Sequence, residues 1–171
     1  MNLSGRQLQD AELVDDVAAA LRDSGLDPTS LVLEITESVV IQSSEAMLEK
    51  LHELKALGVR LAIDDFGTGY SSLSYLQRFP VDILKIDKSF VDDVTRSNND
   101  AALARTIIAL GDMLSLRTVA EGVEDTKQHA LLRELGCELG QGYLFARPVP
   151  AEELAGLMRS PQHGEAAPAR S

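Results

Sequence analysis

The stretch Val59-Arg60-Leu61-Ala62-Ile63-Asp64-Asp65 is an apolar run that ends on two aspartates. Short continuous apolar runs are typical of strands in a parallel sheet that is covered by helices. Four further runs of this kind occur, at residues 31–35, 82–86, 117–120 and 142–145. The sequence therefore predicts a parallel sheet of at least these five strands.

Between the runs, apolar residues recur at intervals of three and four, which indicates helices with one buried face. The stripes are Leu13, Val17 and Leu21 before Gly25; Met47, Leu48, Leu51, Leu54 and Leu57 before Gly58; and Leu103, Ile107, Leu110 and Leu114. Pro150 suits the first turn of a last helix that carries Leu154, Leu157 and Met158. Because the last dozen residues show no periodicity, we expect one domain over residues 1–158 and a flexible tail over 159–171.

The composition excludes several classes of protein. The 171 residues include 16 Lys and Arg against 27 Asp and Glu, which gives a net charge of −11 and argues against binding of DNA or RNA. No apolar run approaches the roughly 20 residues of a membrane span, and the N-terminus does not resemble a signal peptide. The single cysteine, Cys137, is expected to be a buried thiol in a reducing compartment. We therefore expect a cytoplasmic protein.

Alternation of strands and helices leaves two main architectures, an open doubly wound sheet or a closed (β/α)8 barrel. No glycine-rich phosphate-binding fingerprint supports the open sheet. Charged residues instead stand at or just after the carboxyl ends of four runs, namely Glu34, Asp64, Asp65, Lys85, Asp87 and Glu121. Strand ends of this kind converge on one mouth of a barrel, where active sites are built. Five strands are too few for a complete barrel.

The carboxylates of Glu34, Asp64, Asp65 and Glu121 would repel one another at one mouth unless protons or cations intervene. Oxygen ligands of this kind suit Mg²⁺ or Mn²⁺, and the adjacent pair Asp64 and Asp65 suggests one carboxylate shared by two metal ions. Asn2 could add a neutral carbonyl ligand. For each carboxylate taken alone, a solvated acid remains the alternative.

Lys85 lies within an apolar run and so points either into the barrel or towards an acid. Beside a metal site it could orient a nucleophilic water and offset negative charge, and it could also form an ion pair with Asp87 or Glu121. Residues 66–72 contain two glycines and three Ser or Thr hydroxyl groups, which suits either a substrate-covering loop or a simple turn.

Six short strings occur in order: Asn2-Leu3-Ser4, Glu34-Ile35-Thr36-Glu37-Ser38, Asp64-Asp65-Phe66-Gly67-Thr68-Gly69-Tyr70-Ser71-Ser72-Leu73, Leu84-Lys85-Ile86-Asp87, Ala120-Glu121-Gly122-Val123-Glu124 and Gln141-Gly142-Tyr143. From residue 2 to about residue 158 the chain closely resembles the EAL domain family, the bacterial phosphodiesterases that hydrolyse cyclic di-GMP. The resemblance implies a TIM-type (β/α)8 barrel in which two Mg²⁺ or Mn²⁺ ions help to open cyclic di-GMP to linear pGpG.

The resemblance also implies roles for individual residues. The implied ligands of the first metal are Asn2, Glu34 and Asp64, those of the second are Asp64 and Asp65, and Glu121 completes the cluster. Lys85 would position the attacking water, so that Lys85, Glu121 and Asp65 form the catalytic group. Glu37 would anchor the loop at 66–72, which the family links to dimerisation, and Asp87, Glu124 and Gln141 would bind substrate or anchor loops.

One departure from the family pattern bears on activity. The Glu-Ala-Leu string that names the family, and that supplies a ligand of its first metal, does not occur in this sequence. We therefore expect a partial EAL domain that lacks roughly the first two strands, with little or no activity of its own. Because the sequence opens in the middle of a motif, we take a truncated gene or a misplaced start as a hypothesis.

Two other functions remain open at this stage. A noncatalytic module that binds cyclic di-GMP or another protein would keep the pocket while losing a catalytic ligand. A different barrel phosphohydrolase would explain the carboxylates, but it would not explain six motifs in this order.

Overall fold

The computed structural model describes residues 1–41, 44–69, 76–92, 94–95 and 98–157. In this part of the chain one sheet contains five parallel strands in sequence order: β1 (Val32–Thr36), β2 (Arg60–Phe66), β3 (Ile83–Ile86), β4 (Arg117–Ala120) and β5 (Leu139–Gly140). The helices are α1 (Gly5–Leu8), α2 (Leu13–Ser24), the 3₁₀ turn η1 (Pro28–Ser30), α3 (Glu37–Ile41), α4 (Glu45–Ala56), α6 (Lys88–Asp92), α7 (Asn98–Met113), α8 (Thr126–Glu134) and α9 (Ala151–Leu157). The predicted α/β alternation is confirmed.

The two faces of the sheet have different chemistry. Because side chains alternate along a strand, residues paired in register share a face. Ile35, Ile63 and Leu84 are paired in this way and are almost completely buried. This face packs into the main hydrophobic core together with residues of α4 and α7. The opposite face carries Glu34, Asp64 and Lys85. Packing of the apolar face therefore stabilises the sheet, and these charged side chains lie on the side away from the main core.

The first three residues extend the sheet beyond β1. The N-terminal ammonium of Met1 donates to the carbonyl of Val32 at 2.8 Å, and the amide of Leu3 donates to the carbonyl of Glu34 at 2.7 Å. Asn2 forms a parallel bridge with Glu34. The sheet of the described residues is open, with this segment at one edge and β5 at the other, as expected for an incomplete barrel.

The predicted helical segments are confirmed, and their ends follow the local sequence. Two residues of the predicted apolar stripes, Leu103 and Leu154, are exposed, and Met158 lies outside the described residues. α2 ends at Ser24, where Gly25 adopts a left-handed conformation with φ 65°. α8 begins with a capping box, in which the Asp125 side chain accepts from the amide of Gln128 and the Gln128 side chain accepts from the amide of Asp125. The first cap ends α2 ahead of β1, and the second fixes where the loop after β4 gives way to helix.

The predicted strand at residues 142–145 is wrong. β5 lies earlier, and Gly142 passes so close to Val123 that an added Cβ would lie 2.3 Å from the backbone nitrogen of Val123. The chain then turns, with the amide of Phe145 donating to the carbonyl of Gly142 at 3.1 Å. Leu144 and Phe145 are apolar because they pack against the core from a turn, which a hydrophobic run alone cannot distinguish from a strand.

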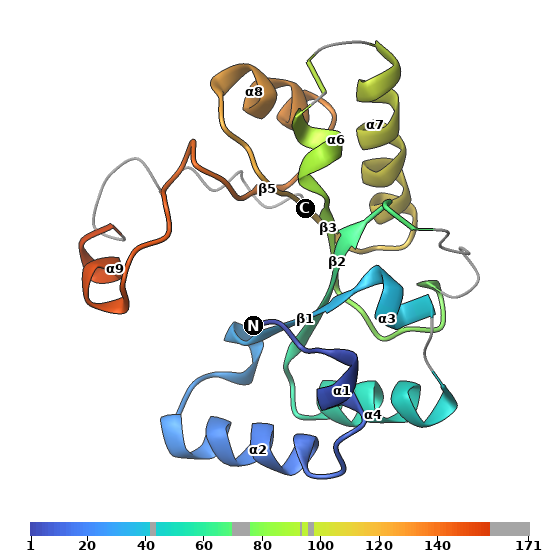
Figure 1. Ribbon diagram of the computed structural model, residues 1–171, viewed down its shortest axis with the longest axis vertical. Helices are drawn as coiled ribbons and strands as arrows, with labels where there is room; N and C mark the ends of the chain where they lie inside the picture. Colours follow the sequence, from blue (N-terminus) through green and yellow to red (C-terminus); the bar gives the residue numbers. More distant parts are fainter. Residues whose placement is uncertain (42–43, 70–75, 93, 96–97, 158–171) are drawn as a thin grey trace.

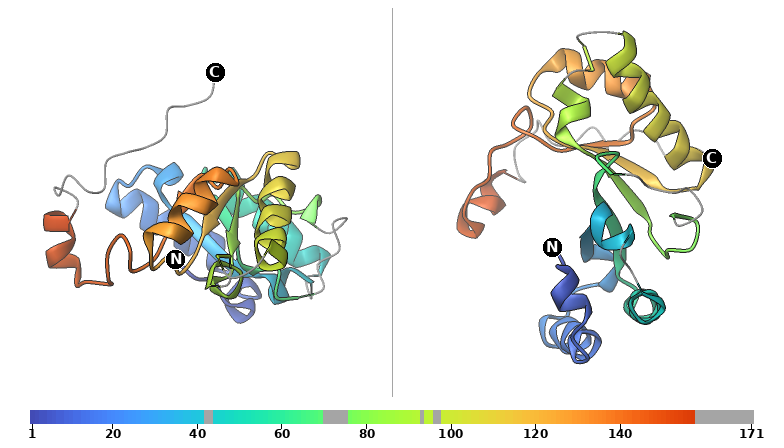
Figure 2. Two further views of the ribbon diagram at one scale, coloured as in Figure 1. Left: turned by 90° about the horizontal axis from the view of Figure 1, so that it is seen from above. Right: turned by 45° about the vertical axis from the view of Figure 1, so that its right-hand side comes forward.

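Figure 1 shows the strands crossing between two groups of helices, with α1, α2 and α4 below and α6, α7 and α8 above. α9 stands apart from both groups of helices, and both views in Figure 2 show the same separation. The predicted tail at residues 159–171 lies outside the described residues. No helix within the described residues has the length and apolar character needed to cross a membrane.

Gly111 in α7 supports a close approach between this helix and β4. A Cβ added at Gly111 would lie 2.5 Å from Cγ2 of the buried Thr118 and 3.2 Å from the carbonyl oxygen of Leu116. We expect Gly111→Ala to lower the free energy of unfolding by about 1–3 kcal/mol, because Thr118 must move within a packed layer. Urea denaturation measures this change. Gly5→Ala is the control, since its Cβ would meet only an ordinary 3.5 Å contact with Val39; equal stability of the two variants would contradict the expectation.

Candidate active site

One buried lysine joins acidic side chains from three strand ends. Lys85 Nζ in β3 lies 2.8 Å from Asp64 Oδ1 of β2, 2.8 Å from Glu121 Oε1 just after β4, and 3.1 Å from Glu34 Oε2 of β1. Lys85 is only 5% exposed, whereas its three partners are partly exposed. We call these four residues the Lys85 cluster. The predicted convergence of charged strand ends is therefore seen directly in the contacts.

The charges of the Lys85 cluster depend on one another. Burial alone would lower the pKa of Lys85, but hydrogen bonds to Asp64, Glu121 and Glu34 outweigh burial, so the pKa lies well above its ordinary value. Burial raises the pKa of Glu121, an effect that the ammonium of Lys85 only partly offsets. Lys85 therefore stays charged and serves as the local counter-ion for an acidic site.

Asp65 joins this site through an irregularity in β2. Adjacent residues of a regular strand point to opposite faces, so Asp64 and Asp65 would normally diverge. The pairing of β2 with β3 shifts between Ile63 and Phe66, and Asp65 has a left-handed backbone with φ 54°. Left-handed backbone is unfavourable for a residue with a side chain and is often found at functional sites. The irregularity lets both aspartates face the same mouth.

The arrangement fits a hard divalent cation. Asp64, Asp65 and Glu121 each offer a carboxylate oxygen, and these oxygens lie within 4.8 Å of one another. Burial raises the pKa of Asp65 first of all, and the neighbouring charges of Asp64 and Asp87 raise it further. A bound cation stabilises the charged forms of carboxylates that raise one another's pKa in this way. Their oxygen atoms are ligands that suit Mg²⁺ or Mn²⁺. The donor set therefore matches the predicted metal chemistry.

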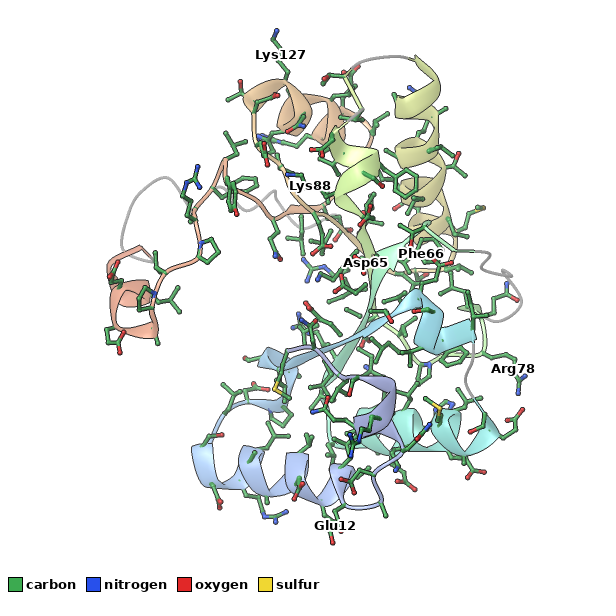
Figure 3. The ribbon with its side chains drawn as sticks, in the orientation of Figure 1. Glu12, Asp65, Phe66, Arg78, Lys88 and Lys127 are labelled. Atoms are coloured by element: carbon green, nitrogen blue, oxygen red, sulfur yellow. The ribbon has the colours of Figure 1, made fainter. Side chains whose placement is uncertain are left out.

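Asp65 and Phe66 can be found near the middle of Figure 3, where β2 ends between the two groups of helices. Glu12, Arg78 and Lys127 lie at the outer edge of the same view. The acidic site thus lies at the centre of the sheet and not on an outlying helix.

Glu37 connects the start of α3 to the loop after β2. Its side chain is buried, and Oε2 accepts hydrogen bonds from the amides of Gly67 at 2.9 Å and Gly69 at 3.1 Å. A Cβ at Gly69 would lie 2.8 Å from Oε1 of Glu37, so the loop approaches closely because it lacks a side chain there. Residues 70–72 of the predicted loop lie outside the described residues.

Asn2 and Gln141 lie at the two edges of the sheet. Asn2 is held beside Glu34 by the bridge described above. The amide of Gln141 donates to the carbonyl of Ala120 at 2.8 Å, and its side chain is exposed. Among the described residues, no hydrogen bond joins either side chain to the Lys85 cluster.

Asp87 and Glu124 have other partners. Asp87 accepts from the amide of Ser89 at 2.9 Å and from its hydroxyl group, and Glu124 pairs with Lys88. Of the two ion-pair partners considered for Lys85, the structure contains Glu121; no Lys85–Asp87 salt bridge occurs within the described residues. The charge of Asp87 affects the site instead by raising the pKa of Asp65.

Sequence reasoning missed Gln128, a buried residue that positions the segment after β4. Its Oε1 accepts from the amides of Glu124 at 2.8 Å and Asp125 at 3.1 Å, and its Nε2 donates to the carbonyl of Val91 at 3.3 Å. It thereby ties the loop that carries Glu121 to α6. The spacing Asp125-x-x-Gln128, typical of a capping box, was the available signal.

Comparison with known proteins gives a consistent result. Residues 1–148 match the EAL domain family. The cyclic di-GMP phosphodiesterase NbdA of Pseudomonas aeruginosa is 47% identical over 171 residues, which is all of this chain but only 22% of that relative. The solved structure described as PaMucR phosphodiesterase in complex with c-di-GMP is 49% identical, with a TM-score of 0.84 over 90% of this chain and 62% of that chain. A manganese and cyclic di-GMP complex of BlrP1 from Klebsiella pneumoniae is 36% identical, with a TM-score of 0.80 over 86% of this chain and 38% of that chain.

The chain thus spans about a fifth of the length of its relative NbdA. The family match includes all five strands and every member of the Lys85 cluster. The order of the strands and the convergence of acids at their carboxyl ends agree with the match. The chain belongs to the EAL domain family.

Proposed function

We propose that this chain carries the site of a metal-dependent phosphodiesterase that opens cyclic di-GMP to linear pGpG. The observation that carries the proposal is the convergence of Glu34, Asp64 and Glu121 on Lys85, with Asp65 turned towards the same mouth. Membership of the EAL family supports the reaction class. Relatives named as cyclic di-GMP phosphodiesterases, and solved relatives that hold cyclic di-GMP, support the substrate.

Divalent cations bound at this site would lower the pKa of a water molecule and polarise the phosphodiester. A relative that holds manganese supports divalent metal dependence, and two ions of Mg²⁺ or Mn²⁺ are our proposal. The proposed ligands are Asn2, Glu34 and Asp64 for the first ion and Asp64 and Asp65 for the second, with Glu121 completing the cluster. The shared position of Asp64, which contacts Lys85 and lies beside Asp65, suits the bridging role.

Lys85 has two tasks in the proposed reaction. Three carboxylates hold its ammonium in place and engage its three N–H donors, so one of them becomes available to the attacking water when a bound cation takes over a carboxylate. The same positive charge offsets the negative charge that develops on the phosphorane-like transition state. In both tasks Lys85 serves as a hydrogen-bond donor and a positive charge.

Glu37, Asp87, Glu124 and Gln141 are proposed to bind substrate or to hold loops. The contacts of Glu37 with Gly67 and Gly69 support the second role for that residue. Association of two copies and a cytoplasmic location remain predictions from the sequence.

Replacement of Asp65 tests the metal site. Asp65→Asn keeps the side-chain shape and removes one ligand charge, so we expect Mn²⁺ affinity to fall about tenfold or more and pGpG formation to fall with it. Because we expect low turnover from this chain, pGpG is measured with the protein in excess over cyclic di-GMP. Asp112→Asn, an exposed position on α7, is the matched control.

Equal rates of pGpG formation by Asp65→Asn and the unchanged chain would contradict the proposed site. Tight binding of cyclic di-GMP in Ca²⁺ without any pGpG in Mn²⁺ would favour the noncatalytic binding module instead.

Removal of the lysine charge tests the electrostatic balance of the site. Lys85→Met fills a similar volume but leaves three carboxylates without their counter-ion, so we expect the metal-free variant to lose roughly 2 kcal/mol or more of unfolding free energy. Mn²⁺ should restore part of this loss, since a cation then supplies the missing charge. Denaturation in EDTA and in Mn²⁺ measures both effects.

Lys88→Met is the control, because Lys88 is exposed and its salt bridge with Glu124 lies at the surface. Wild-type stability of Lys85→Met in EDTA would show that the acids do not need this lysine.

A further inference from the structure

An open cavity with a partly polar lining lies at the end of the sheet opposite the acidic site. It has a volume of about 470 Å³ and is found at the amino ends of β2, β3 and β4. Its polar lining consists of Thr29, Lys55, Arg60, Asp82, Ser115 and Arg117. The volume falls within the range of about 300–1,000 Å³ that is usual for small-molecule pockets. None of these residues has a part in the proposed phosphodiesterase site.

The strand register directs two arginines into this cavity. Ala62 pairs with Ile83, and Ile83 pairs with Arg117, so these three residues share a face of the sheet. Arg60 stands two positions before Ala62 on the same strand and therefore lies on that face too. Arg60 and Arg117 come from strands separated only by β3, and both line the cavity. Long guanidinium side chains from these positions can converge on one small ligand.

The lining carries excess positive charge. Of its four charged side chains, three are cationic, and only Lys55 is matched within the cavity: Nζ lies 2.7 Å and 2.8 Å from the two carboxylate oxygens of Asp82. Asp82 also accepts from the amide of Leu61, so its oxygens are largely engaged. The cavity thus contains one satisfied ion pair and two further cations.

The two arginines keep unused donors. Arg117 meets Glu138 through Nε alone, at 3.1 Å, and this salt bridge is half exposed. No salt bridge to Arg60 occurs within the described residues. The amide and hydroxyl of Thr29 both donate to Oδ1 of Asp27, and the charge of Arg60 contributes to lowering the pKa of this carboxyl. Planar guanidinium groups with free donors are well suited to phosphate oxygens.

We propose that this cavity binds the phosphate group of a small phosphorylated molecule, with Arg60 and Arg117 as the main contacts. Lys55 is held by Asp82 and shapes the floor of the site, and the hydroxyl groups of Ser115 and Thr29 lie within the lining. Arg60 and Asp64 are four residues apart on β2, so this site is about 13 Å from the acidic mouth. The two sites have opposite charge and do not share a ligand.

Phosphate binding can be measured residue by residue by NMR titration of the ¹⁵N-labelled chain in EDTA at low ionic strength. The probes are inorganic phosphate, GMP and guanosine. We expect GMP to shift the amides of Arg60, Asp82, Ser115 and Arg117 in a saturable way, and guanosine to leave them unchanged. Tighter binding of GMP than of phosphate identifies a phosphate ester as the ligand, and equal binding identifies free phosphate.

Arg60→Gln and Arg117→Gln should each weaken GMP binding about tenfold, because each removes a charge-assisted hydrogen bond. Lys127→Gln, at the outer edge of the molecule in Figure 3, removes the same charge elsewhere and should leave binding unchanged. Asp64→Asn should also leave it unchanged, which separates this site from the phosphodiesterase site. Unshifted amides, equal binding of guanosine, or undiminished binding by both arginine variants would overturn the proposal.

Discussion

Burial of the Lys85 ammonium among three carboxylates is the interaction on which the rest of the site depends. Each carboxylate comes from a different strand or strand end, so the contacts form only when β1 to β4 are paired in the observed register. A slip of one residue on any strand would move its charged side chain to the apolar face. The charged site and the hydrophobic core therefore select the same strand alignment, because the apolar residues of one face and the charged strand ends of the other are placed correctly only in this register.

Much of this arrangement could be read from the sequence. The apolar runs at 31–35, 59–63, 82–86 and 117–120 predicted four of the strands, and acids at their carboxyl ends predicted where charge gathers. The fifth strand was misplaced, because apolar residues that pack from a turn look like a short strand. Of the three carboxylates that contact Lys85, only Glu121 was proposed from the sequence as an ion-pair partner. The partners depend on side-chain direction at the ends of four strands, which the sequence does not specify.

The irregularity at Asp65 and the arginine cavity were beyond sequence reasoning for physical reasons. Left-handed backbone is most often signalled by glycine, and an aspartate such as Asp65 is a much weaker signal because it usually adopts other conformations. Arg60 and Arg117 each begin a strand, where a charged residue is normally taken as a boundary marker. That both lie on one face follows only from the register of β2, β3 and β4. Local sequence determines which side chains are present, but pairing between distant segments determines which of them meet.

The hydrogen bonds of Glu37 have a mechanical consequence. Glu37 opens α3, directly after β1, and its buried carboxylate holds the amides of Gly67 and Gly69 in the loop after β2. Glu34 lies only three residues earlier on β1. Displacement of this loop away from α3 would break both hydrogen bonds, and each break costs free energy because the carboxylate that accepts them is buried. These hydrogen bonds therefore join the described part of the loop to the start of α3, three residues after Glu34.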